Sequence, residues 1–172
     1  MIFIGKEDEE FHQNLGEIGN GGTSITYKIK DARTDKLICK KVLRYRPDQT
    51  FQDARNAMRE FEFLSRIKHP CICKAVCINI LEPLQVNVNG ENQQITTIAL
   101  FLEFVDHKLA SILSDNNIAT NTHKTKIVVE VAHALNFIHK HHMIHRDLKI
   151  ENIMLNSALE VKLMVTLSCK TQ

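Results

Sequence analysis

The first hundred residues alternate between apolar and polar positions in short runs, which is the pattern of β-strands separated by turns. Residues 15–45, LGEIGNGGTSITYKIKDARTDKLICKKVLRY, predict three strands joined by a glycine turn and a polar turn. Further strands are expected around residues 71–80, CICKAVCINI, and residues 95–104, ITTIALFLEF. The dipeptide Asn89-Gly90 between them is typical of a hairpin turn.

Three other segments have apolar residues three or four positions apart, which predicts helices. The first lies between the strands, where Thr50 and Asp53 suit a capping box and Pro70 closes the pattern. A short helix is expected over about 109–113 and a long one over about 122–141, followed by two short strands, NIML and EVKLMV. The long helix has an apolar face made of Ile127, Val128, Val131, Ala132, Leu135 and Ile138. The order predicts an α+β fold with a small, mostly β lobe followed by the start of a helical lobe.

Composition and charge narrow the class of protein. With 172 residues, 44% of them apolar, the chain can form one domain or two small lobes. A net charge of +2 gives no electrostatic reason to expect nucleic acid or a membrane surface as partner. The N-terminus MIFIGKEDEE lacks the basic start and long apolar run of a signal peptide. Five cysteines without zinc-site spacing fit reduced thiols, so we expect a cytoplasmic protein.

The strand region carries candidate residues for binding a phosphate-containing ligand. Adjacent glycines in GEIGNGG, residues 16–22, let backbone N–H groups approach phosphate oxygens, although a simple turn explains them equally well. Lys41 shares a strand face with Cys39 and Leu43, so it can face a nucleotide while Lys40 faces solvent. Glu60, beside the apolar stripe of the first helix, can turn inward to meet a lysine or form a boundary salt bridge.

The segment HRDLKIEN, residues 145–152, has the residue types of a phosphoryl-transfer site. Asp147 can accept a hydroxyl proton, Lys149 can neutralise charge on a moving phosphoryl group, and Asn152 can offer an oxygen to magnesium. His145 and Arg146 are expected to brace the loop. A polar turn would explain each residue separately, but not their joint occurrence.

These motifs resemble the eukaryotic protein kinase family, and Lys149 resembles its Ser/Thr branch. The resemblance covers about residues 14–164. It implies an N-lobe over 14–102, with an antiparallel five-stranded sheet and the helix called αC, a hinge over 103–107, and a C-lobe over 108–172. It further implies ATP, Mg²⁺ and a protein substrate, with Asp147, Lys149 and Asn152 as catalytic residues. The ATP-binding residues it implies are Ile18, Gly19, Asn20, Gly21, Gly22, Thr26, Cys39, Lys41, Glu60 as the partner of Lys41, and the backbone of Glu103 and Val105.

Some positions depart from the family pattern. Ser24 replaces the third glycine, Thr26 a valine and Cys39 an alanine. Val165-Thr166-Leu167 stands where the family has Asp-Phe-Gly, whose aspartate holds magnesium. Only Asn152 then remains as a metal ligand, so we expect impaired phosphoryl transfer.

The sequence after Met164 supports two further expectations. A two-base shift can turn codons for Val-Thr-Leu into Asp-Phe, so we hypothesise that VTLSCKTQ is a frame-shifted or unspliced tail of a truncated catalytic domain. The apolar face of the long helix would then stay partly exposed. The alternative function is a non-catalytic, pseudokinase-like module, or a gene fragment, that binds nucleotide or docks on a partner kinase.

Overall fold

The computed structural model describes residues 10–21, 24–43, 58–59, 61–80, 84–88, 91–95, 98–114, 120–165 and 168–169. The chain divides into two compact units. The first contains Met1–Arg66 and Ala75–Phe104, and the second contains Ile67–Lys74 and Val105–Gln172.

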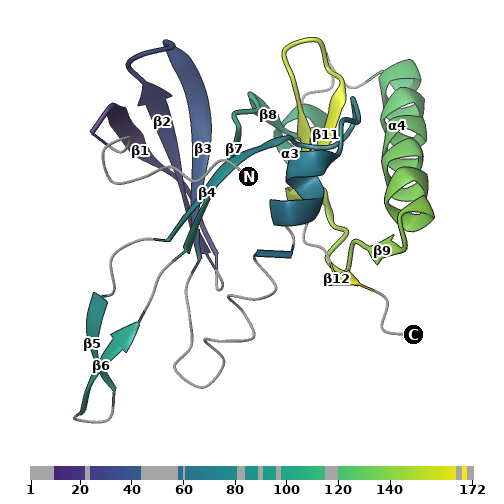
Figure 1. Cartoon of the computed structure of the whole chain (residues 1–172). Helices are drawn as coiled ribbons and strands as arrows, with labels where there is room; N and C mark the ends of the chain where they lie inside the picture. Colours follow the sequence, from purple (N-terminus) through teal and green to yellow (C-terminus); the bar gives the residue numbers. More distant parts are fainter. Residues whose placement is uncertain are drawn as a thin grey trace. The chain divides into compact units, whose positions relative to one another are not determined.

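A five-stranded antiparallel sheet forms the first unit (Figure 1). Its strands follow the order β1-β2-β3-β7-β4, so β7 is inserted between β3 and β4. The predicted five-stranded antiparallel sheet is therefore confirmed. The strands are β1 (His12–Asn20), β2 (Ser24–Asp31), β3 (Lys36–Leu43), β4 (Ala75–Ile80) and β7 (Ile98–Glu103).

One face of this sheet carries a cluster of buried apolar side chains. Ile29 on β2 stands opposite Ile38 on β3, and both belong to the cluster with Phe101 of β7.

The first unit also contains a helix. Residues 58, 59 and 61–66 are helical, and Phe61 and Leu64 on this helix are buried. Their spacing of three residues is the apolar spacing that predicted the helix. The predicted capping residues Thr50 and Asp53 lie outside the described residues.

A second, separate sheet lies between β4 and β7 in the sequence. It consists of β5 (Leu84–Val88) and β6 (Glu91–Ile95), which pair with each other in antiparallel fashion. The sequence predicted a hairpin turn at 89–90 but placed strands at 71–80 and 95–104 on either side of it. The structure has β5 and β6 on either side of residues 89–90. β6, ENQQI, has little of the composition that marks strands, whereas β5, LQVNV, alternates apolar and amide residues as strands do.

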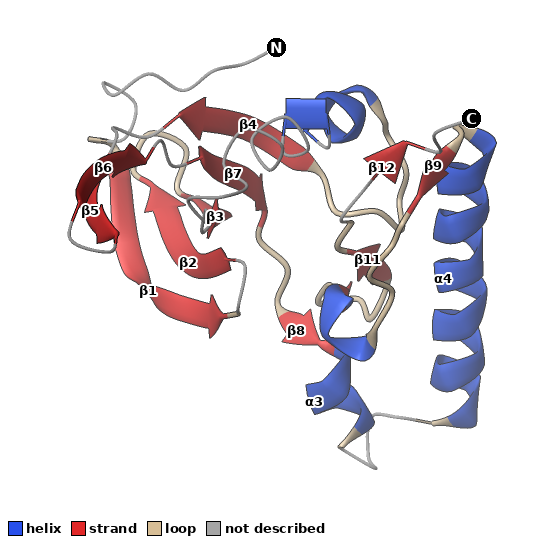
Figure 2. Cartoon of the chain, turned by 90° about the horizontal axis from the view of Figure 1, so that it is seen from below, coloured by secondary structure: helices blue, strands red, loops and turns tan. Residues whose placement is uncertain are grey.

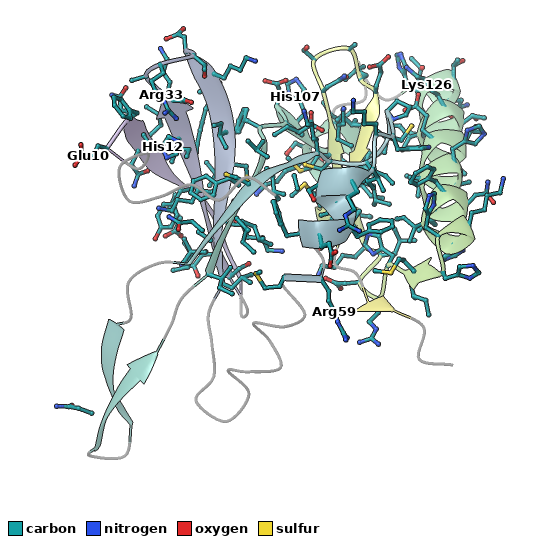
Figure 3. The ribbon with its side chains drawn as sticks, viewed as in Figure 1. Glu10, His12, Arg33, Arg59, His107 and Lys126 are labelled. Carbon is teal, nitrogen blue, oxygen red and sulfur yellow. The ribbon has the colours of Figure 1, made fainter. Side chains whose placement is uncertain are left out.

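The second unit holds small sheets built from short strands. β10 (Ile153–Leu155) pairs with β11 (Val161–Leu163) on one side and with β8 (His107–Lys108) on the other, and His107 is labelled in Figure 3. β9 (Met143–Ile144) pairs with β12 (Ser168–Cys169). Ile72 forms a parallel bridge with Leu163, whose N–H donates to the carbonyl of Cys71 at 2.9 Å. This backbone pairing explains why residues 67–74 belong to the second unit.

Two helices complete the second unit (Figure 2). α3 spans Leu109–Leu113 and α4 spans Asn121–Lys140, as predicted to within a residue. The Thr120 hydroxyl caps α4 by accepting from the N–H of His123 at 3.3 Å. Ile127 and Ile138 are buried, so the expected partial exposure of the apolar stripe is wrong at both. Val128, predicted on that face, is 68% exposed because it lies one position away from Ile127.

No helix among the described residues is long and apolar enough to cross a bilayer.

Candidate active site

The loop that follows β9 begins with a buried histidine. His145 is 3% exposed, and its Nε2 lies 2.9 Å from the carbonyl oxygen of Met164. Because a carbonyl only accepts, Nε2 must carry the proton. Burial lowers the pKa of His145, although its hydrogen bond to Met164 and the nearby Asp147 carboxylate act in the opposite direction. His145 is therefore a neutral ring that ties the loop to the end of β11.

A tight turn at Arg146 follows. The N–H of Asp147 donates to the carbonyl of His145 at 2.8 Å, and Arg146 between them has a φ of +62°. A hydrogen bond across two residues with positive φ at the centre is the pattern of a strained γ-turn. Arginine has no special tolerance for this region of backbone space, so the turn holds local strain. The turn places Asp147 where two side chains reach it.

The Asp147 carboxylate is the centre of the loop. Its Oδ2 lies 2.8 Å from Nζ of Lys149 and 2.9 Å from Nδ2 of Asn152, which also donates to the Asp147 carbonyl at 2.7 Å. The hydrogen bond from Lys149 is the largest cause that lowers the pKa of Asp147, and the Asn152 bond adds to it. The same pair raises the pKa of Lys149. The Asp147 and Lys149 side chains are 47% and 49% exposed, so a substrate group can reach the carboxylate.

Asn152 is held by backbone and side-chain bonds. It ends the 3₁₀ turn η1 (Ile150–Asn152), where its N–H donates to the carbonyl of Lys149 at 3.0 Å. Its own carbonyl accepts from the N–H of Met164 at 2.8 Å. Since Nδ2 is engaged with Asp147, Oδ1 is the amide atom that can face a metal ion. The structure thus brings Asp147, Lys149 and Asn152 together, as the sequence predicted.

The residue at the family's aspartate position is apolar and buried. Val165 follows Met164 directly and is 6% exposed. Residues 165–172 contain no carboxylate, and the described residues form no group of three metal-ligating His, Cys, Asp or Glu side chains. A magnesium ion bridging phosphates needs more oxygen ligands than Asn152 supplies. The residues present do not fit the magnesium site of the family.

The first unit places three of the predicted nucleotide-binding residues, Thr26, Cys39 and Lys41, on one face of its sheet. Thr26 of β2 stands opposite Lys41 of β3, and Cys39 stands opposite Lys28. Thr26, Lys28, Cys39 and Lys41 therefore share one face. The alternation of β3 predicted this for Cys39 and Lys41. Lys40 lies on the other face, where its Nζ is 5.5 Å from the ring centroid of Phe101. Burial raises the pKa of the Cys39 thiol to about 11, so Cys39 is a neutral side chain of this face.

The glycine loop joins β1 and β2. Gly19 stands opposite Thr26, and the N–H of Gly21 donates to the carbonyl of Ser24 at 2.9 Å. A Cβ added at Gly19 would come no closer than 3.6 Å to its neighbours, and one at Gly21 no closer than 3.7 Å. Neither position has a positive φ that would favour glycine, and neither is so crowded by the chain that a side chain could not fit. Their small size thus leaves space beside the backbone for an external group.

The remaining predicted residues are less informative. Ile18 is an exposed residue at a register shift of β1, and Asn20 ends that strand. Glu103 ends β7 opposite Ile38, and Val105 is buried in the second unit. Gly22 and Glu60 lie outside the described residues, so the ion pair of Lys41 with Glu60 stays a prediction.

Sequence reasoning did not identify two features near these residues. The carbonyl of Met164 holds His145, and a backbone acceptor leaves no mark in the sequence. Lys28 lies with its Nζ 4.4 Å from the ring centroid of Phe104, on the face that carries Lys41. The strand alternation that assigned Lys41 to its face also applies to Lys28 and could have identified it.

Comparison with known proteins agrees with this arrangement. The model of the protein kinase domain matches residues 12–164. The chain belongs to the protein kinase family, and the resemblance seen in the sequence is confirmed.

Its relatives include proteins named as cyclin-dependent kinases. Cyclin-dependent kinase G1 of Arabidopsis thaliana is 26% identical over 95% of this chain and 26% of its own length. Human cyclin-dependent kinase 10 is 28% identical over 83% of this chain and 37% of its own. Cell division control protein 2 homolog 3 of Trypanosoma brucei brucei is 29% identical over 92% of this chain and 47% of its own length. The chain spans less than half the length of these curated relatives.

Proposed function

We propose that this chain carries the nucleotide-binding sheet and the catalytic loop of an ATP-dependent protein serine/threonine kinase, and that the 172-residue chain transfers phosphate poorly. The observation that carries the proposal is the convergence of Lys149 and Asn152 on one carboxylate oxygen of Asp147. Three groups with the charges and hydrogen-bonding capacity needed for phosphoryl transfer are thereby held in one loop.

The roles of the loop residues follow from their charges. Asp147 is ionised at neutral pH, so its carboxylate orients a serine or threonine hydroxyl and accepts its proton. Lys149, a cation about half exposed, neutralises negative charge on the transferred group. His145 holds the loop in place through Met164 and does not take part in the chemistry.

ATP is the proposed nucleotide, and magnesium is the ion that members of this family use to neutralise its phosphates. The glycine loop, residues 19–22, binds the phosphates through backbone N–H groups other than that of Gly21, which donates to the carbonyl of Ser24. Lys41 pairs with the phosphates while Glu60 orients Lys41. Adenine packs against Ile18, Thr26 and Cys39 and meets the backbone of Glu103 and Val105. No step is assigned to magnesium here, because Val165 leaves Asn152 as the lone ligand among the predicted residues.

Transfer of radiolabelled phosphate from ATP to serine- and threonine-containing peptides tests the proposal. We expect slow transfer by the chain and none by Asp147→Asn, which keeps the size of the side chain but cannot accept the proton. Val165→Asp adds the missing carboxylate and is expected to increase magnesium-dependent transfer. Val165→Thr, which matches valine in shape without a charge, is its control. Equal transfer by Asp147→Asn and the unchanged chain would refute the role of Asp147.

A second candidate is a non-catalytic nucleotide-binding module that docks on a protein partner. The buried, apolar Val165 favours it. Thermal denaturation with ATP shows whether either kind of protein binds the nucleotide. Phosphate transfer then distinguishes the two, because a module transfers none, whereas the proposed kinase keeps slow transfer that Asp147→Asn abolishes. Two of the relatives are named as cyclin-dependent, which makes a regulatory protein subunit a candidate partner along with a protein substrate or an intact kinase.

A further inference from the structure

The hairpin β5–β6 is a sheet of its own within the first unit (Figure 1). β4 and β7 are hydrogen-bonded neighbours, and their last register pair is Ile80 with Ile98. The chain leaves the main sheet after this pair, forms β5 and β6, and returns to the same point. Among the described strands, β5 pairs with β6 alone. A two-stranded sheet in water is marginally stable and needs further strands or a packing surface.

The register of the hairpin separates two kinds of residue. Gln85 stands opposite Gln94, and Asn87 stands opposite Asn92, so these register positions belong to one face of the pair, and the sequence has amide residues at all four. The other face carries the register positions of Leu84, Val86 and Val88 on β5. β5 thus alternates strictly between apolar and amide residues and contains no charge.

Each strand of an isolated hairpin has one edge whose backbone groups its partner strand does not use. Natural proteins protect such edges with charges, proline or bulges. β5 has none of these, and its pairing with β6 is regular over all five residues. β6 differs because it begins with Glu91. β5 is therefore the edge better suited to accept another strand.

We propose that β5 pairs in antiparallel fashion with β5 of a second copy of this chain, which makes a four-stranded sheet across a two-fold axis at Val86. In this register Val86 meets Val86 of the other copy, Gln85 meets Asn87, and Leu84 meets Val88. Apolar positions then face apolar positions and amides face amides, with no like charges opposed. Pairing of β6 with itself would instead set Glu91 opposite Ile95. This polarity match selects β5, and a second copy, as the partner.

The proposal does not depend on the proposed function, since none of the predicted site residues lies in the hairpin. Sedimentation equilibrium of the full chain is the test, and we expect a concentration-dependent dimer. Val86→Lys places two ammonium groups opposite each other at the axis and is expected to raise the dimer dissociation constant about tenfold or more. Gln93→Lys is the matched control, because position 93 pairs with Val86 inside the hairpin but lies on the far strand. It should leave the dissociation constant unchanged.

A rescue keeps the test informative if Val86→Lys also disturbs the hairpin. Mixing the Val86→Lys and Val86→Glu chains sets opposite charges at the axis, so the mixture should dimerise more tightly than either variant alone. A chain that stays monomeric at all concentrations overturns the proposal. So does a dimer that Gln93→Lys weakens as much as Val86→Lys, or a mixture without recovery.

Discussion

The Nε2 atom of His145 lies 2.9 Å from the carbonyl oxygen of Met164, which is 19 positions further along the chain. This bond joins the start of the catalytic loop to the residue that precedes Val165. The ring is buried and its Nδ1 has no hydrogen-bond partner in the described part of the chain. The side-chain anchor of the loop on Met164 is thus a neutral ring, beside the backbone bond from Met164 to Asn152, and its contribution to stability depends on the ring remaining neutral.

We expect acid to weaken this anchor. Burial lowers the pKa of His145 below its ordinary value of 6.5, so the unfolded chain binds the proton more readily than the folded chain. The contribution to the free energy of unfolding is complete above about pH 6.5 and is lost as the pH falls through the lower, folded pKa. Urea unfolding between pH 5 and 8 should show this loss. His145→Gln keeps a donor for the Met164 carbonyl and should remove that part of the pH dependence. If the free energy of unfolding of the variant changes with pH as steeply as that of the unchanged chain, His145 is not its cause.

The Lys149 ammonium should control the ionisation of Asp147. Lys149→Met removes the largest cause that lowers the pKa of Asp147, so the pKa should rise toward its ordinary value of 3.8. Carbon-detected NMR titration of the Asp147 carboxyl measures this directly. Because the folded pKa is the lower one, the pair stabilises the fold above about pH 3.8 and loses that effect as the pH falls through the folded pKa. Glu151→Gln is the control. The charge of Glu151 acts on Lys149 but is no cause of the pKa shift of Asp147, so this variant should leave the pKa of Asp147 unchanged.

Strain at Arg146 should be relieved by glycine. The φ of +62° is unfavourable for a side chain with a Cβ but not for glycine. We expect Arg146→Gly to increase the free energy of unfolding by up to about 1 kcal/mol, and Arg146→Val to decrease it. Arg146→Ala keeps the strain while it removes the side chain, so it should resemble the unchanged chain. Stabilisation by alanine as large as by glycine would mean that the arginine side chain, and not the backbone, is responsible.

The buried thiol of Cys39 should make the fold sensitive to alkali. The pKa of Cys39 rises from 9.0 to about 11, so the folded chain keeps a proton that the unfolded chain loses. Stability should therefore fall as the pH rises from 9 to 11. Chemical unfolding of the chain and of Cys39→Ala over this range measures the effect. The alanine variant should lack the part of the decline that Cys39 causes. Identical dependence of the free energy of unfolding on pH in the two chains would contradict this role of Cys39.

Elements with a strong local pattern were predicted well from the sequence. The bounds of α3 and α4 follow from apolar spacing. The face of β3 that carries Lys41 follows from simple alternation. These features depend on neighbours within a few residues, which the sequence displays directly.

Features that depend on distant backbone groups were not predicted. The bridge between Ile72 and Leu163 and the hydrogen bond of His145 to Met164 use backbone atoms, which are the same in every residue. β6 was missed because only Ile95 in ENQQI favours a strand, whereas β5, LQVNV, alternates apolar and amide residues and could have been identified from that alternation. Val128 was placed on the buried face of α4, where the spacing of its neighbours could not distinguish the centre of the face from its border.

The central claim is that the chain binds ATP while Val165 deprives it of the metal ligand that the family uses. Calorimetric titration with ATP, with and without magnesium, tests it most directly, with Val165→Asp beside the unchanged chain. We expect magnesium to alter the dissociation constant of the unchanged chain for ATP by less than about twofold. We expect Val165→Asp to bind ATP about tenfold more tightly with magnesium than without it. Tight binding by the unchanged chain only with magnesium, or no binding of ATP at all, would contradict this account.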